Sequence, residues 1–268
     1  MPDIYYLCDN TATVLKISFL MEIVTTILLI SVISFAATLF RSTFGFGEAL
    51  IAVPLFCLFL PVQVAVPLAV MMSIVVAAVV VVQDYKQIHL SSAKWLIGFA
   101  ILGIPFGLAL LFYADEFIVK IFLGIIIIAY SIYSIAGKNN YVLENDSKLW
   151  LFICGFLSGV FGGAYGVNGP PLVVYGNLRR WNAQDFRATL QAYFLIAGLV
   201  SIIGYIGKGL LDTTVMEYCL YSLPAIIPAI FLGRYFNRKI KSDSFYRYVY
   251  WGLAFIGIML IMSTILIH

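Results

Sequence analysis

Histidine and charge are both scarce in this chain of 268 residues. It has two histidines, too few for a metal cluster, and only 11% of its residues are charged. A soluble domain usually has about a quarter. The four cysteines lack CxxC spacing, and three lie in apolar segments, where small buried side chains are expected. We therefore expect no metal ion and no cofactor.

Patterns typical of catalysis and nucleotide binding are also missing. The chain has no GxxxxGK[ST] sequence, so ATP hydrolysis within it is not indicated. An enzyme embedded in a membrane would need a nucleophile with a base, or a metal cluster, inside a span. Clustered carboxylates are absent from the apolar segments. The sequence therefore predicts that the protein is not an enzyme.

Hydrophobic residues make up 63% of the chain, and several apolar runs approach the length of a membrane span. A helix needs roughly 20 apolar residues to cross the hydrocarbon core. The pattern predicts an all-α polytopic membrane protein with ten apolar segments, at about 14–41, 46–60, 62–83, 93–113, 117–136, 149–163, 169–178, 188–207, 214–233 and 245–267.

Two of these segments, 149–163 and 169–178, are too short to cross a membrane alone. Together they predict a pair of half-helices that dip into the membrane and return.

Lysine and arginine are distributed unequally between the two faces that alternating segments would create. The loops at 84–94, 137–148, 178–187 and 234–247 share one face and hold 12 of the 16 Lys and Arg residues. Cytoplasmic loops carry an excess of these residues. We therefore expect a multi-pass protein of the cell (inner) membrane, with these loops in the cytoplasm and both termini extracytoplasmic.

A weak internal repeat emerges when the sequence is shifted by 121 residues. STFGFGEALIAVPLF (42–56) then aligns with GAYGVNGPPLVVYGN (163–177), and each half holds five apolar segments. An odd number of crossings inserts the second half upside down, as in many secondary transporters. The sequence therefore predicts two inverted five-segment repeats, residues 1–140 and 141–268, in one bundle.

Glycines break the chain in both aligned motifs, which is costly in lipid unless the break lines a cavity or is buried in protein. Gly169-Pro170-Pro171 suits the first turn of a helix with Asn168 as its N-cap. In the first half a helix is expected to start near Glu48.

We expect these broken helices or re-entrant hairpins to meet near mid-membrane, where two helix N-termini would form an anion site. The alternative is that the glycines only permit close helix packing. That role is the one expected for Gly103-xxx-Gly107 and Gly155-xxx-Gly159.

At FGFGEALIAVPLF, GGAYGVNGPPLVVYGNLRRW and FRATLQAYFL the chain resembles the TauE/SafE sulfite exporter family, also called the toluene-sulfonate uptake permease family. The resemblance covers nearly the whole chain. It implies two inverted halves and the transport of sulfite or sulfur-containing organic anions. Many members have a glycine triplet in the first motif, where this chain has Gly47-Glu48-Ala49.

Glu48 and Arg41 are candidates for proton coupling. The Glu48 carboxylate could carry the proton, pair with Arg41, or only satisfy a helix dipole. Arg41 could bind the anion or neutralise Glu48. Arg187 and Gln191 share a helical face, and they either line the path or bond between helices. The substrate-binding candidates are Phe44, Gly45, Gly47, Glu48, Tyr165, Gly166, Asn168, Gly169, Arg187 and Gln191.

The sequence thus predicts a secondary transporter of a small, sulfur-containing anion, coupled to an ion or a proton, with a passive anion channel as the alternative. The expected partners are the small anion, the lipid bilayer, a coupling proton or sodium ion, and a second copy of the chain in a homodimer. We expect no nucleic-acid partner.

Overall fold

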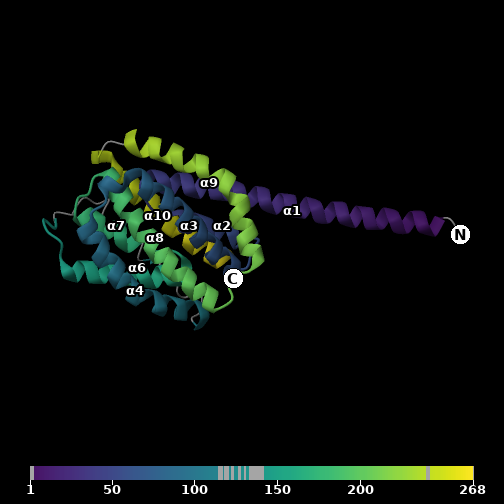
Figure 1. The fold of residues 1–268 in the computed structure, drawn as a ribbon, viewed down its shortest axis with the longest axis horizontal. Helices are drawn as coiled ribbons and strands as arrows, with labels where there is room; N and C mark the ends of the chain where they lie inside the picture. The colour runs from purple at the N-terminus through teal and green to yellow at the C-terminus, as the bar shows by residue number, and fades with distance from the viewer. Residues whose placement is uncertain are drawn as a thin grey trace.

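The computed structural model describes residues 3–113, 117, 121, 124–125, 128–129, 131–132, 142–239 and 242–267, for some of them the backbone alone. These residues form helices and connecting segments, without a strand among them (Figure 1). The helices are α1 (Asp3–Phe44), α2 (Glu48–Phe56), α3 (Val62–Asp84), the 3-10 turn η1 (Tyr85–Gln87), α4 (Leu90–Tyr113), α6 (Lys148–Tyr165), α7 (Gly169–Leu178), α8 (Ala183–Gly207), α9 (Thr213–Lys239) and α10 (Ser242–Ile267).

Five helices in the described part of the chain are long and apolar enough to cross a membrane. The spans are Ile23–Phe44, Val62–Gln87, Leu90–Leu111, Ala183–Gly207 and Thr213–Lys239. The prediction of an all-helical multi-pass membrane protein is confirmed. The predicted segment 117–136 and the predicted boundary near residue 140 lie largely outside the described residues.

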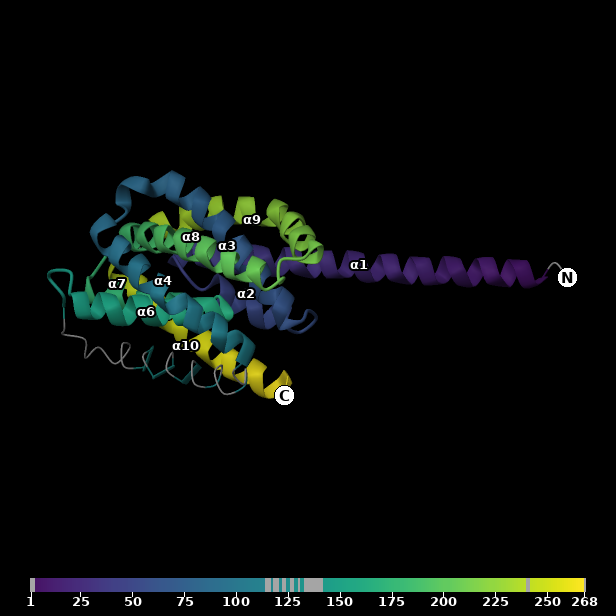
Figure 2. The same ribbon diagram turned by 60° about the horizontal axis from the view of Figure 1, so that its bottom comes forward.

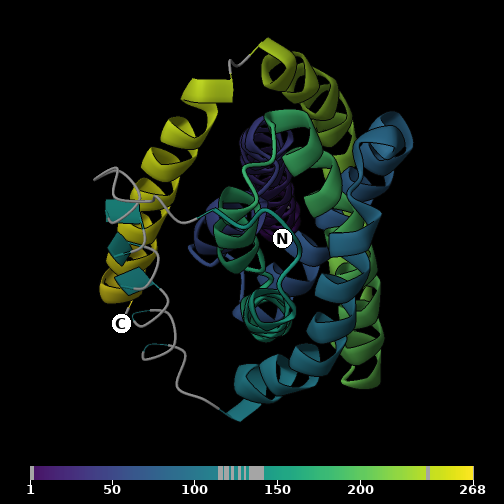
Figure 3. The same cartoon turned by 90° about the vertical axis from the view of Figure 1, so that its left-hand side faces the viewer.

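Helix α1 begins earlier than the predicted segment 14–41. It runs without interruption for 42 residues from Asp3, or roughly 63 Å at 1.5 Å per residue. A bilayer core is only about 30 Å thick. Figure 1 shows the N-terminal part of α1 projecting away from the other helices, and Figure 3 shows α1 end-on among them. The run of apolar residues predicted the membrane-spanning part of α1 but not its more polar N-terminal part.

Both predicted chain breaks are present. Helix α1 ends at Phe44 and α2 begins at Glu48, while α6 ends at Tyr165 and α7 begins at Gly169. The predicted helix starts are therefore confirmed. The helices that follow the breaks have 9 and 10 residues, too short to span a bilayer. The inverted orientation of the two halves stays a prediction.

Glycine is required at these breaks because the backbone turns into the left-handed region. The φ angles are 90° at Gly45, 98° at Gly47 and 69° at Gly166. Residues with a Cβ rarely adopt such angles. The glycines therefore encode the two breaks locally, before any tertiary contact forms.

Helix α6, which leads into the second break, lies directly against α4 (Figure 2). A Cβ on Gly103 or Gly107 would overlap the carbonyl oxygens of Phe156 and Val160. Gly159 faces Ala100 in the same way, so both helices contribute glycines to the contact. Such residues let helix backbones approach closely in membranes. Close packing, the expected role of these GxxxG pairs, is confirmed.

The segment before α6 fixes the far end of α7 through Asp146. Its Oδ1 accepts hydrogen bonds from Ser92 Oγ at 2.8 Å and from Tyr175 Oη at 2.6 Å, and Arg179 Nε lies 3.3 Å away. Burial acts to raise the pKa of Asp146, but the two hydroxyl donors and the charge of Arg179 hold that pKa below its ordinary value. The carboxylate therefore anchors α7 to the start of α4.

Candidate functional site

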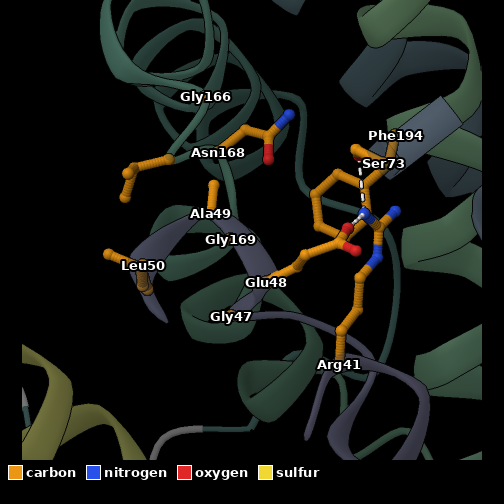
Figure 4. A pocket seen from close by; sticks show the side chains of 11 residues that line it. Arg41, Gly47, Glu48, Ala49, Leu50, Ser73, Gly166, Asn168, Gly169 and Phe194 are labelled. Atoms are coloured by element: carbon orange, nitrogen blue, oxygen red, sulfur yellow. Dashed lines mark hydrogen bonds and ion pairs between the residues drawn. The ribbon is translucent and has the colours of Figure 1, made fainter. Parts of the chain in front are cut away.

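The two chain breaks lie against each other. A Cβ on Gly169 would be 3.1 Å from Phe46 Cβ, and one on Gly166 would be 3.5 Å from Ala49 Cβ. A pocket lies at this contact, with the first turns of α2 and α7 in its wall (Figure 4). Its lining residues are Arg41, Gly47, Glu48, Ala49, Leu50, Ser73, Gly166, Val167, Asn168, Gly169 and Phe194.

An ion pair lies inside the pocket. Arg41, on the last turn of α1, donates from Nη1 to Glu48 Oε2 on the first turn of α2 (Figure 4). Thr38 Oγ1 donates to the other carboxylate oxygen, Oε1, at 2.8 Å. The side chains of Arg41 and Glu48 are 3% and 2% exposed. Of the roles predicted for Glu48 and Arg41, the structure shows their mutual pairing.

Three further side chains hold the guanidinium of Arg41. Its Nε and Nη2 donate to Gln191 Oε1 at 3.1 and 2.6 Å, and its Nη1 also donates to Ser73 Oγ at 2.6 Å. The guanidinium carbon lies 4.8 Å from the ring centre of Phe194, in cation–π geometry. Arg41 is thus held by α2, α3 and α8 at once, and most of its N–H donors are already used.

Gln191 supports the pocket indirectly, through its bonds to Arg41 and to the first chain break. Its Oε1 orients Arg41, while its Nε2 donates to Gly45 O at 3.2 Å. One side chain on α8 therefore holds both the cation and the first break. Gln191 does not itself line the pocket, so we describe it as a positioning residue.

The two helix N-termini at the pocket differ in their hydrogen-bond donors. At the start of α2 the N–H groups of Glu48, Ala49 and Leu50 have no acceptor within the helix. At the start of α7, prolines occupy the second and third positions, and proline has no N–H. Both ends carry the positive pole of a helix dipole, but α2 offers more backbone donors.

Asn168 differs from the prediction. It occupies the N-cap position of α7, but its side chain makes no capping hydrogen bond and its backbone is helical, with φ −91° and ψ −5°. Its carbonyl accepts from Ser158 Oγ at 2.5 Å, and its side chain packs on Gly162. The Asn168 amide lines the pocket (Figure 4). Because it does not cap the helix, the amide is available to a ligand.

Other predicted site residues lie outside the pocket wall. Phe44 packs on Phe40 with ring centres 4.7 Å apart, and Gly45 lies against Phe186 and the backbone of Arg187. The side chain of Tyr165 lies outside the described residues.

Arg187 does not line the pocket. Its Nη1 pairs with Asp84, and its Nε donates to Ser42 O at 2.7 Å. Of the two roles predicted for Arg187, lining the path or bonding between helices, the structure shows bonds between helices.

Three residues that shape the site were not predicted from the sequence: Thr38, Ser73 and Phe194. Thr38 and Ser73 are single hydroxyls within apolar runs, which usually bond to their own helix backbone. The spacing of Thr38 and Arg41, three residues apart on one helical face, was the available signal.

The pocket is narrow in this structure. Its free volume is about 10 Å³, room for about a single water molecule. A sulfur oxyanion is larger, so its entry requires Glu48 or the surrounding helices to move. The arrangement is a buried cation whose present counter-ion is an internal carboxylate.

Comparison with known proteins agrees with these observations. The family model for sulfite exporter TauE/SafE matches residues 30–260. A curated relative, the "Probable sulfite/organosulfonate exporter TauE" of Cupriavidus necator, is 25% identical over 148 residues, which cover 55% of this chain and 57% of the relative. The matched region thus spans little more than half of the relative's length. No solved structure matches the chain.

The family model extends from within α1 to within α10 and includes both breaks and every residue of the pocket. This family consists of transporters, and membership therefore agrees with the prediction of a non-enzymatic membrane protein. The chain belongs to the sulfite exporter TauE/SafE family.

Proposed function

We propose that the protein is a secondary transporter that moves sulfite or a small organosulfonate through the pocket between α2 and α7. The observation that carries this proposal is the Arg41–Glu48 ion pair at the meeting point of two helix N-termini. Family membership and the name of the relative supply the substrate class.

Glu48 and the anion compete for the same guanidinium. Arg41 uses Nε and one Nη2 hydrogen on Gln191, and Nη1 bonds to both Glu48 and Ser73. The Nη1 hydrogen now on Glu48 is the donor that an oxyanion in place of the carboxylate would take. Two negative charges at that distance repel strongly in a low-dielectric interior. The anion therefore binds when Glu48 is protonated or displaced.

This competition couples the anion to a proton. When Glu48 is protonated, the positive charge of Arg41 has no counter-ion, and the anion takes that role. When the anion leaves, Glu48 loses its proton and pairs with Arg41 again. The positive ends of α2 and α7 favour the anion throughout the exchange.

The small free volume of the pocket favours a transporter over a passive anion channel. A free volume of about one water molecule does not let an anion pass without a conformational step. The glycine-broken segments provide backbone that can move when the pocket opens. A channel would need a continuous open path instead.

The test is sulfite uptake into proteoliposomes under an imposed pH gradient. Wild-type protein should accumulate sulfite against its concentration gradient. Glu48→Gln should abolish gradient-driven accumulation but retain sulfite binding, because neutral glutamine resembles the protonated acid. Sulfite binding to this variant should lose the part of its pH dependence that comes from protonation of Glu48.

Glu217→Gln is the matched control. Glu217 is exposed on α9, so its replacement removes the same charge at a position away from the pocket. It should transport as the wild type does. Wild-type accumulation and pH dependence in Glu48→Gln would remove Glu48 from the coupling step. Accumulation driven by sodium in place of pH would identify a different coupling ion.

A further inference from the structure

A second group of charges lies where α3 and α9 end and α8 begins. Asp84 Oδ2 accepts from Arg187 Nη1, Asp84 Oδ1 lies 2.5 Å from Arg234 Nη2, and Arg238 Nη2 lies 3.7 Å from the same oxygen. We name these four residues the Asp84 cluster. One carboxylate faces three guanidinium groups, so the cluster carries a surplus of positive charge.

The Asp84 cluster also contains buried donors without acceptors. Among the described residues, Arg187 Nη2 and Arg234 Nε have no hydrogen-bond partner. The side chain of Arg187 is only 1% exposed. A buried donor left unpaired loses its hydration without replacement, and surplus buried charge is costlier still. Both observations indicate that the cluster accommodates a further negative group.

The cluster is open to solvent on one side. Arg234 is 24% exposed and Arg238 is 55% exposed. An anion from solution therefore meets these two arginines first, while Arg187 lies behind them against α1. Guanidinium groups present paired N–H donors that suit oxyanions.

The Asp84 cluster adjoins the pocket through two helices. Arg187 Nε bonds to the carbonyl of Ser42, the residue after Arg41 on α1. On α8, Arg187 stands one helical turn before Gln191, which holds Arg41. The Asp84 cluster and the Arg41–Glu48 pair therefore follow one another along α1 and α8.

We propose that Arg187, Arg234 and Arg238 form an antechamber for the transported oxyanion, with Asp84 as its resident counter-ion. The anion displaces Asp84 from Arg234 and Arg238 and waits there before it reaches Arg41. This inference rests on the proposed function for the identity of the anion. The predicted orientation of the loops places the antechamber on the cytoplasmic side.

Equilibrium binding of radiolabelled sulfite to the full chain in lipid nanodiscs tests the antechamber. Wild-type protein should bind sulfite in a tighter and a weaker step. Arg238→Gln and, separately, Arg234→Gln should weaken the weaker step by at least about tenfold and leave the tighter step. Because Arg238 is exposed, its replacement leaves the buried pairing of Asp84 with Arg187 in place.

Lys86→Gln is the matched control: it removes the same charge from an exposed position two residues after Asp84. It should leave both binding steps unchanged, which separates a local site from the general attraction of a basic surface. Arg41→Gln should remove the tighter step and leave the weaker one.

The possible failures are distinct. Unchanged binding in both Arg234→Gln and Arg238→Gln would overturn the antechamber and leave the Asp84 cluster as a structural ion network. Retention of the tighter step in Arg41→Gln, with loss of the weaker step in Arg238→Gln, would overturn the proposed pocket while supporting the antechamber. A well-folded wild-type chain that binds no sulfite would overturn both.

Discussion

At the scale of single residues, Asn168 gives the most direct test of the pocket. Its amide lines the pocket and caps no helix, so a change of charge there disturbs no capping bond. Asn168→Asp should fold normally, because the start of α7 tolerates a negative charge. It should weaken anion binding at least about tenfold, or roughly 1.4 kcal/mol, as measured by sulfite titration of the purified protein.

Asn182→Asp is the matched control for this change. Asn182 is the N-cap of α8, where its Oδ1 accepts from the backbone N–H groups of Gln184 and Asp185. It is exposed and lies outside the pocket wall, so binding should be unaffected. Equal affinity for sulfite in wild type and Asn168→Asp would move the anion away from this pocket.

The residue scale also shows what the sequence could reveal about the site. Glu48 and Arg41 lie seven residues apart across one glycine break, so their pairing was among the expected arrangements. Arg187 pairs with Asp84, which is 103 residues away. Helical spacing places Arg187 and Gln191 on one face of α8, but it does not indicate which groups of α1 and α3 each of them meets.

At the scale of helices, the contact between α4 and α6 holds the second break in its position within the bundle. Gly107→Leu should push these helices apart, because even a Cβ there would overlap the carbonyl of Val160. Overpacking of this kind costs typically about 1–3 kcal/mol. The expected result is a lower midpoint of thermal unfolding in detergent, together with weaker sulfite binding as α7 shifts.

Gly98→Leu provides the comparison on the same helix. A Cβ at Gly98 would meet nothing within 4 Å, so leucine there should be neutral, or stabilising by about 1 kcal/mol through helix propensity. If Gly107→Leu were as stable as Gly98→Leu, close packing of the glycines would not be what positions α6.

Helix boundaries at the breaks were predictable for a local reason. Glycine permits left-handed backbone and proline favours a first helical turn, so GFGE and GVNGPP mark helix starts without tertiary information. The early start of α1 at Asp3 was not predictable from apolar runs, because residues 3–13 include polar side chains. Those residues continue a helix that is already formed downstream.

At the scale of the whole molecule, cysteine labelling tests the predicted orientation in the membrane. Cysteine would be introduced at Tyr85, in η1, or at Gly207, at the end of α8, in a chain without its native cysteines. In intact cells, an impermeant thiol reagent should label Gly207→Cys and spare Tyr85→Cys until the membrane is opened. The excess of Lys and Arg near Tyr85 is the physical reason. The reverse labelling pattern would show that the predicted orientation is wrong and that the Asp84 cluster faces the outside of the cell.

The proline pair at the start of α7 bears on how quickly the transporter could turn over. Pro170 and Pro171 leave α7 with its dipole but with few N–H groups to bond an anion. Long-range attraction falls gradually as the anion moves, whereas hydrogen bonds break over a fraction of an ångström. The α7 side would then attract the anion without retaining it, and departure along that side would meet a lower kinetic barrier. Release rates, more than affinity, would reflect this difference between the two halves.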